Sequence, residues 1–316
     1  MASEATIARL AKPRSILKAS GARIHLPFPE QIALAFFAYI TLAAFPFHLS
    51  ARELGVIISL NALTLATLMT LNRNRQRANW LAAAADFLPA VLILVAYRES
   101  GLLLIPDSSH HLDYLFIQWD RVLLHNQFVP AVLQVGAPWF EHYLEFAYML
   151  CYPLVPLGVA AIHFVSRGKD KPAAERAMND FWATVLLATL FCYAVYPFFP
   201  LTPPRVLFGD LPGPHVEPLL RQWNFWLLDH YSVQACIFPS GHVAAATAVA
   251  LAVRKHAPRL GVLFLFLAAS VAIATIYGRY HYAADAFVGA LVGVAAYLTS
   301  QAIQHRFSND RPQFVA

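Results

Sequence analysis

One segment of this sequence carries the residue types that nucleophilic chemistry needs. His281 and Asp285 are four residues apart, so on a helix they share a face and the carboxylate can bond one ring nitrogen. That bond fixes the tautomer and leaves the other nitrogen as a nucleophile. Arg279 lies two residues upstream of His281, and its planar, permanently charged guanidinium suits phosphate oxygens. Taken alone, the segment also fits an interfacial arginine beside a structural His–Asp pair.

A second segment, Phe238–His242, stands before an apolar helical run. Ser240 is the expected N-cap of this helix, and Gly241 lets a ligand approach the backbone. The free N–H groups and positive dipole end of a helix start bind anions, and His242 would project toward a bound anion. On its own this pattern is no more than a helix cap, but together the two segments predict a phosphate site.

The composition sets the class of protein that must hold these residues. Of 316 residues 59% are hydrophobic and 13% are charged, and the mean hydropathy is +0.52. These values indicate a polytopic membrane protein. The net charge of +5 comes from short basic tracts between apolar segments, a pattern of membrane topology rather than of a nucleic-acid surface. No nucleic-acid partner is expected.

The apolar segments predict an all-α membrane helical bundle with about eight transmembrane helices. A bilayer core needs roughly 20 apolar residues in a helix. The candidate spans are residues 30–49, 54–71, 80–97, 143–165, 180–199, 241–254, 260–277 and 283–303.

Basic and sparsely charged connections alternate at every step between these spans. The positive-inside rule then places both termini in the cytoplasm. It also places the chemically promising residues on the opposite, extracytoplasmic side. These residues are Arg205, His242, Arg279, His281 and Asp285. Their convergence on one side indicates a single site.

The chain divides accordingly into five parts. These are a cytoplasmic basic tail (1–29), N-terminal transmembrane helices (30–97), an extracytoplasmic or interfacial connection (98–142), a catalytic core (143–303) and a cytoplasmic tail (304–316). Within 98–142, apolar residues recur at helical spacing from Leu112 to Leu123. They predict an amphipathic helix that lies on the membrane or covers the site. A helix packed on the bundle without a substrate role is the alternative.

Four further ionisable residues invite a structural interpretation. Asp86 lies inside the third predicted span, and an intramembrane acid needs a partner. We expect a hydrogen bond to another helix. Glu141, His142 and Glu145 flank the start of the fourth span. We expect them to anchor it at the membrane interface rather than to line a substrate entrance.

The two segments resemble the second and third signature motifs of the type 2 phosphatidic acid phosphatase superfamily. Its members are helical membrane phosphatases and phosphotransferases, along with soluble haloperoxidases. The resemblance covers roughly residues 140–303. It implies a phosphatidic acid phosphatase-like core, a lipid phosphate substrate, and phosphoryl transfer without metal or other cofactor.

The resemblance also implies residue roles. His281 would be the nucleophile that forms a phosphohistidine, Asp285 its orienting partner and His242 the general acid. The phosphate would be held by Ser240, Gly241 and Arg279.

The first motif of that family departs from its usual form here. It usually has a lysine seven residues before an Arg-Pro. This chain has Pro203-Pro204-Arg205, with Phe198 in the place of the lysine and Val206 in the place of the proline. The Pro-Pro-Arg form is similar to the branch that contains fungal inositol phosphorylceramide synthases. Arg205 is thereby implied as a second phosphate clamp, although a lone loop arginine is more often solvated.

These motifs leave the reaction open between classes. A lipid hydroxyl as acceptor makes a transferase, which would move a phosphoinositol-type headgroup between lipids. Water as acceptor makes a lipid phosphatase acting on phosphatidic acid or an isoprenyl diphosphate. A non-catalytic membrane protein or transporter that binds anionic lipid is the alternative from another class. The sequence does not predict an oligomeric state.

Overall fold

The computed structural model describes residues 26–47, 49–105, 110–124, 138–209, 219–233 and 236–309. Most of both predicted tails lies outside these residues, at 1–25 and 310–316. The described part is all-helical apart from two short strands, as the long apolar segments predict.

The elements follow the chain in a simple order. The helices are α1 (Phe28–Ala43), α2 (Ala51–Asn74), α3 (Asn79–Leu102), α4 (His111–Leu123), α6 (Pro138–Met149), α7 (Leu154–Val165), α8 (Lys171–Val195), the 3-10 helix η2 (Tyr196–Phe198), α9 (Pro204–Leu207), α10 (Leu219–Tyr231), α11 (Gly241–His256), α12 (Pro258–Tyr277) and α13 (Ala283–Asn309). The strands β1 (Pro200–Leu201) and β2 (Cys236–Ile237) pair antiparallel, with Pro200 opposite Ile237.

Among the described residues, five helices are long and apolar enough to cross a membrane. They are α2, α3, α8, α12 and α13. A sixth span exists if α6 and α7, which meet at 71°, are counted together. These helices support an integral membrane protein.

The predicted count of about eight spans is not confirmed. The first span corresponds to α1, which has 16 residues. The segment 143–165 is broken into α6 and α7 by the turn around Cys151–Pro153. The segment 241–254 becomes α11, also 16 residues, which is about 24 Å long and shorter than the roughly 30 Å bilayer core.

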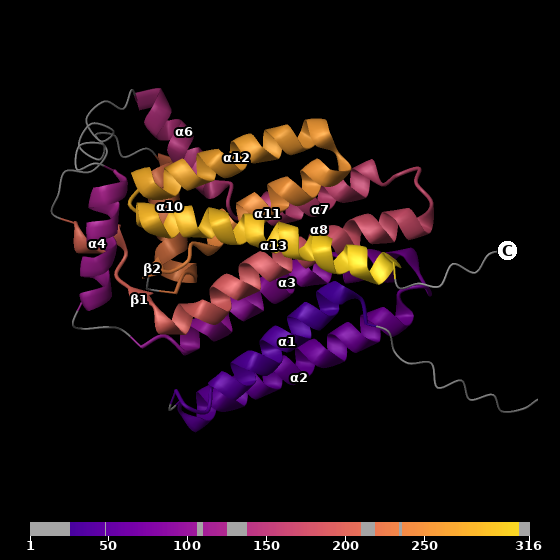
Figure 1. Ribbon diagram of the computed structural model, residues 1–316. Helices are drawn as coiled ribbons and strands as arrows, with labels where there is room; N and C mark the ends of the chain where they lie inside the picture. Colours follow the sequence, from indigo (N-terminus) through magenta and orange to yellow (C-terminus); the bar gives the residue numbers. More distant parts are fainter. Residues whose placement is uncertain are drawn as a thin grey trace, which may run out of the picture.

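The centre of the bundle is formed by α8, α11 and α13, which lie side by side (Figure 1). Two glycines of α13 permit its close approach to α11. A Cβ at Gly289 would lie 2.6 Å from the carbonyl oxygen of Ser240, and one at Gly293 would lie 2.8 Å from that of Ala244. Small residues at this spacing let helix backbones touch. The first turns of α11 and α13 are therefore held together at one end of the bundle.

The helix expected within 98–142 is α4, which lies across the end of the bundle rather than along it (Figure 1). That end is where α8 and α12 finish and where α11 and α13 begin. The arrangement places α4 beside the helix starts that carry the predicted chemistry.

Candidate active site

The His281–Asp285 pair forms as the spacing predicts. His281 Nδ1 is hydrogen-bonded to Oδ2 of Asp285, and both side chains are buried. The backbone N–H of His281 donates to Thr275 O at 3.0 Å, which holds the residue just before α13. Because the carboxylate contacts Nδ1, Nε2 is the ring nitrogen that a nucleophilic role would use.

His242 faces this pair from the first turn of α11. The two imidazole centroids are 5.8 Å apart, with their planes at 78°. Ser240 is the N-cap, as predicted, and its hydroxyl accepts a hydrogen bond from the Val243 N–H at 3.5 Å. Its own N–H donates to Asp285 O at 3.3 Å. This backbone bond couples the two histidine-bearing segments directly.

The close approach of a tyrosine, and not an open space for a ligand, explains why residue 241 is a glycine. A Cβ here would lie 2.3 Å from Oη of Tyr196 and 3.1 Å from Cε1 of Tyr193. Both tyrosines come from the end of α8 and the turn after it. The close approach that the glycine permits is therefore that of Tyr196 to the start of α11.

The structure brings the two predicted arginines together. The Arg205 N–H donates to Arg279 O at 2.9 Å, and the Arg279 guanidinium donates to Phe208 O at 3.1 Å. The short helix α9 is thereby attached to the turn between α12 and α13. Arg279 has a φ of 58°, in the left-handed region, a conformation that non-glycine residues adopt mostly at turns and functional sites. Burial, together with the charge of Arg221, lowers the pKa of Arg279.

Two tyrosines, Tyr148 and Tyr152, lie beside His242. The rings of these two tyrosines pack edge-on against His242, with centroids 5.9 and 5.8 Å from the imidazole. By contrast, Phe198, in the place of the family's lysine, is exposed and packs on Phe47.

The sequence reasoning missed the carboxylate of Asp120, on α4. It accepts hydrogen bonds from the N–H groups of Ala283 and Ala284, both at 2.9 Å. These are two of the orphan donors at the start of α13, so Asp120 caps the helix that carries Asp285. Burial is the main cause that raises the pKa of Asp120.

A second carboxylate of α4 has a similar role. Asp113 accepts from the Thr202 N–H at 2.8 Å and from the Tyr282 hydroxyl at 3.3 Å. Between the two acids, Phe116 packs on Phe238 at a centroid distance of 5.0 Å. The signal in the sequence is the placing of Asp113 and Asp120 seven residues apart, on the face that also carries Phe116.

Glu145 has a buried structural role instead of the expected interfacial one. Its carboxylate accepts hydrogen bonds from Arg221 at 2.8 Å, from Asn224 at 2.8 Å and from the Tyr280 hydroxyl at 2.6 Å. The Tyr280 ring stacks on Tyr148 at 3.7 Å. The ion pair and the other hydrogen bonds of Glu145 thus fix Tyr280, which lies between Arg279 and His281 in the chain.

The expected interfacial anchoring by Glu141 and Glu145 is therefore wrong. Both side chains are buried, and Glu141 accepts a hydrogen bond from the Tyr277 hydroxyl at 2.8 Å. Only His142 of the three is exposed. The carboxylates point inward because hydroxyl and guanidinium donors on other helices satisfy them, which local sequence does not reveal.

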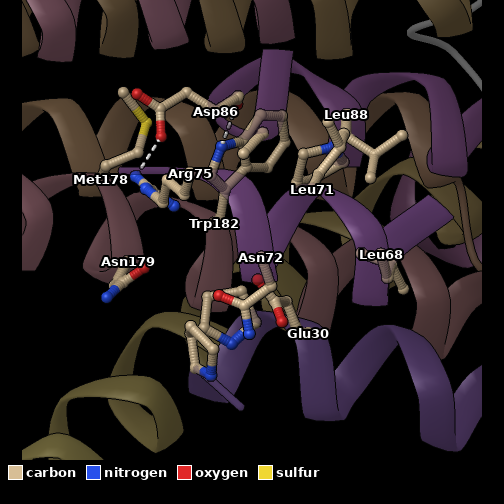
Figure 2. A pocket seen from close by; sticks show the side chains of 14 residues that line it. Glu30, Leu68, Leu71, Asn72, Arg75, Asp86, Leu88, Met178, Asn179 and Trp182 are labelled. Carbon is tan, nitrogen blue, oxygen red and sulfur yellow. Dashed lines mark hydrogen bonds and ion pairs between the residues drawn. The ribbon is translucent and has the colours of Figure 1, made fainter. Parts of the chain in front are cut away.

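A separate polar pocket lies at the other end of the bundle, where α2 ends and α3 and α8 begin (Figure 2). In it Arg75 forms an ion pair with Asp86 at 2.5 Å, and the Trp182 indole donates to Asp86 O at 2.7 Å. This confirms the predicted structural bond of Asp86 to another helix. The pocket links helices far from the two histidines.

Comparison with known proteins gives one match. The family model described as the PAP2 superfamily matches residues 115–299, more than half of the chain. The matched range includes all the predicted site residues and most of α4. No curated protein and no solved structure matches the chain. Members of this superfamily are phosphatases and phosphotransferases, which supports an enzyme of that type.

Proposed function

Because the chain belongs to the PAP2 superfamily, we propose that it transfers the phosphoryl or phosphodiester group of a lipid through a phosphohistidine on His281. The observation that carries the proposal is the buried His281–Asp285 pair with His242 facing it across 5.8 Å. A nucleophile held by an orienting acid, with a second titratable ring within reach of the same group, is the arrangement that covalent transfer requires.

The first half-reaction breaks the bond between phosphorus and the leaving oxygen. The lone pair of His281 Nε2 attacks phosphorus and forms the N–P bond. His242, protonated, gives its proton to the departing lipid oxygen. Asp285 accepts from Nδ1–H and stabilises the positive charge that develops on the His281 ring.

The second half-reaction returns the enzyme to its starting state. The hydroxyl of an acceptor attacks phosphorus while His242 takes its proton. The N–P bond breaks and its electron pair returns to His281. The same His242 therefore serves as acid and then as base.

Positive charge around the phosphate lowers both barriers. The start of α11, capped by Ser240, offers backbone N–H groups and a dipole end. Arg205 and Arg279, joined by their backbones, add two guanidinium groups. Such preorganised charge stabilises the extra negative charge on the equatorial oxygens in the transition state.

The acceptor and headgroup form the finer part of the proposal. The Pro-Pro-Arg form at Arg205 favours transfer of a phosphoinositol-type headgroup between lipids. Hydrolysis of phosphatidic acid or of an isoprenyl diphosphate uses the same intermediate with water as acceptor. We place the site on the extracytoplasmic side, since sparsely charged connections lead to it.

The test incubates purified protein with labelled phosphatidylinositol plus ceramide, and separately with labelled phosphatidic acid, and resolves the products by mass. A new phospholipid indicates transfer, and free phosphate indicates hydrolysis. Acid-labile, alkali-stable label on the denatured protein reports the phosphohistidine. We expect His281→Ala to abolish both product and label. Full turnover by His281→Ala would contradict the mechanism, and lipid binding without any product would favour the non-catalytic alternative.

A further inference from the structure

Helix α4 has three distinct faces. One face, with Asp113, Phe116 and Asp120, is buried on the active site. A second carries Leu115, Trp119, Val122 and Leu123, which are exposed apolar residues at helical spacing. The remaining face is polar and exposed, with Gln118 and Arg121. A helix that divides its surface between protein, an apolar phase and water suits a membrane interface.

Helix α10, on the other side of the site, also has one buried face and one exposed apolar face. Its buried face carries Arg221 and Asn224, which bind Glu145. The opposite face exposes Leu219, Trp223 and Trp226, spaced four and three residues apart. Large exposed tryptophans on a membrane protein collect at the level of the lipid headgroups.

The two helices attach to adjacent positions in the chain, on either side of His281. Through Glu145, α10 holds the Tyr280 hydroxyl. Through Asp120, α4 holds the N–H groups of Ala283 and Ala284. A shift of either helix would therefore move the segment that carries His281.

We propose that the exposed faces of α4 and α10 dock into the membrane–water interface on the active-site side, so that the bilayer holds the His281 segment between them. Three observations select a lipid surface as the occupant. The faces are rich in Trp and Leu, α4 lies across the ends of the candidate spans (Figure 1), and those spans themselves expose large apolar side chains. The catalytic consequence rests on the proposed function, but the docking itself does not.

The test of docking places full-length protein in phosphatidylcholine vesicles that contain lipid brominated near the headgroup, a quencher of tryptophan fluorescence. We expect Trp223→Phe/Trp226→Phe, and separately Trp119→Phe, to lower the quenched fraction, because quenched emitters are removed. The control Trp182→Phe, which removes a buried tryptophan, leaves the fraction unchanged or raises it. A higher quenched fraction after loss of Trp223 and Trp226 overturns the proposal. So does shielding of these residues from both bromolipid and aqueous acrylamide, the result expected if a second protein covers them.

The test of coupling compares Trp223→Ser/Trp226→Ser with Trp80→Ser, an exposed tryptophan at the other end of the bundle. In vesicles, we expect the double variant to lower kcat about tenfold on the lipid and on a soluble short-chain substrate alike, because the segment that carries His281 is no longer held in place. In detergent, where no bilayer holds the two helices, wild type and double variant should turn over the soluble substrate within about twofold of each other. A loss in vesicles that is confined to KM for the lipid contradicts the coupling. If wild-type protein has no activity, the proposed function fails while the quenching result still stands.

Discussion

At the scale of single residues, the proposed mechanism separates groups that would act on the phosphate from groups that support them. His281 and His242 are the two rings that the mechanism uses, and the Asp285 carboxylate is hydrogen-bonded to His281 Nδ1. Tyr196 and Gly241 belong to the supporting group, because their contact sets how closely α8 approaches α11.

The acid role of His242 predicts a loss that depends on the leaving group. His242→Ala should lower turnover of a lipid phosphate by about 10²- to 10⁴-fold, the usual contribution of general acid catalysis. With a nitrophenyl phosphate ester, whose leaving group needs no proton, the loss should shrink to below about tenfold. Steady-state kinetics on both substrates check this. His142→Ala, which alters an exposed histidine, is the matched control, and equal losses on both substrates would rule out an acid role.

Gly241→Ala should create a steric conflict with Tyr196, and Tyr196→Phe should relieve it. The new methyl would meet Tyr196 Oη at 2.3 Å, and overpacking of this kind costs about 1–3 kcal/mol. Tyr196→Phe removes that oxygen, so the double variant should unfold at a higher temperature than Gly241→Ala alone. Thermal unfolding in detergent measures both. A double variant no more stable than the single one would show that the tyrosine contact is not the constraint.

At the scale of elements, the active site is an assembly of helix ends. The starts of α11 and α13 are joined by the Ser240–Asp285 backbone bond. Helix α4 is attached to the first turn of α13 through Asp120, and α10 is attached to the turn before α13 through Glu145. Removing any one of these attachments should loosen the histidines without removing a reacting group.

Asp120→Ala should detach α4 from α13. Two N–H groups lose their acceptor, and loss of a helix cap costs about 1–2 kcal/mol. Asp120→Asn should cost less, because the amide oxygen still accepts one bond. Thermal unfolding of the three proteins measures this order, and an Ala variant as stable as wild type would contradict it.

The burial of Asp120 also predicts that the stability of wild type relative to Asp120→Asn depends on pH. Burial raises the folded-state pKa of Asp120, so the folded protein binds this proton more tightly than the unfolded chain. The resulting stabilisation is fully present below the unfolded pKa and is lost as pH rises through the folded pKa. The stability of wild type relative to Asp120→Asn should therefore increase as pH falls from about 7 to about 4.

Gly289→Ala should separate the starts of α11 and α13, which hold the two histidines in place. Its Cβ would lie 2.6 Å from the backbone oxygen of Ser240, which cannot swing away as a side chain can, so about 1–3 kcal/mol of stability and most of the activity should be lost. Gly55→Ala is the control, because a Cβ there meets nothing within 4 Å; alanine in a helix should stabilise it by up to about 1 kcal/mol. Unfolding and activity assays compare the two, and equal behaviour would refute the packing argument.

At the scale of the whole molecule, the predicted site residues gather at one end of the bundle, whereas the Lys171 start of α8 and the Arg254–Lys255 end of α11 lie at the other. This separation of the site from the basic turns is what the charge alternation predicts. The side of the membrane on which each end lies stays a prediction of the positive-inside rule.

Cysteine labelling tests that sidedness. Val206 and Lys169 are exposed, at the site end and at the basic end respectively. Of the three native cysteines, Cys151 and Cys192 are buried, and Cys236 is replaced by serine in both variants. In intact cells, a membrane-impermeant maleimide should label Val206→Cys but not Lys169→Cys. After permeabilisation both should react. The reverse pattern in intact cells would place the active site in the cytoplasm.

The sequence by itself determined the His281–Asp285 pairing, the Ser240 helix cap and the sharing of one bundle end. These follow from the four-residue spacing of the pair, from local backbone chemistry and from charge alternation, all of which are readable without distant partners. Only the tertiary structure decided the break of residues 143–165 into two helices, the tyrosine against Gly241, and the capping of α13 by α4. Asp120 lies 163 residues from Ala283, and Glu145 lies 135 from Tyr280. Which buried donor meets which acceptor depends on how helices far apart in the sequence pack, and no local pattern encodes that choice.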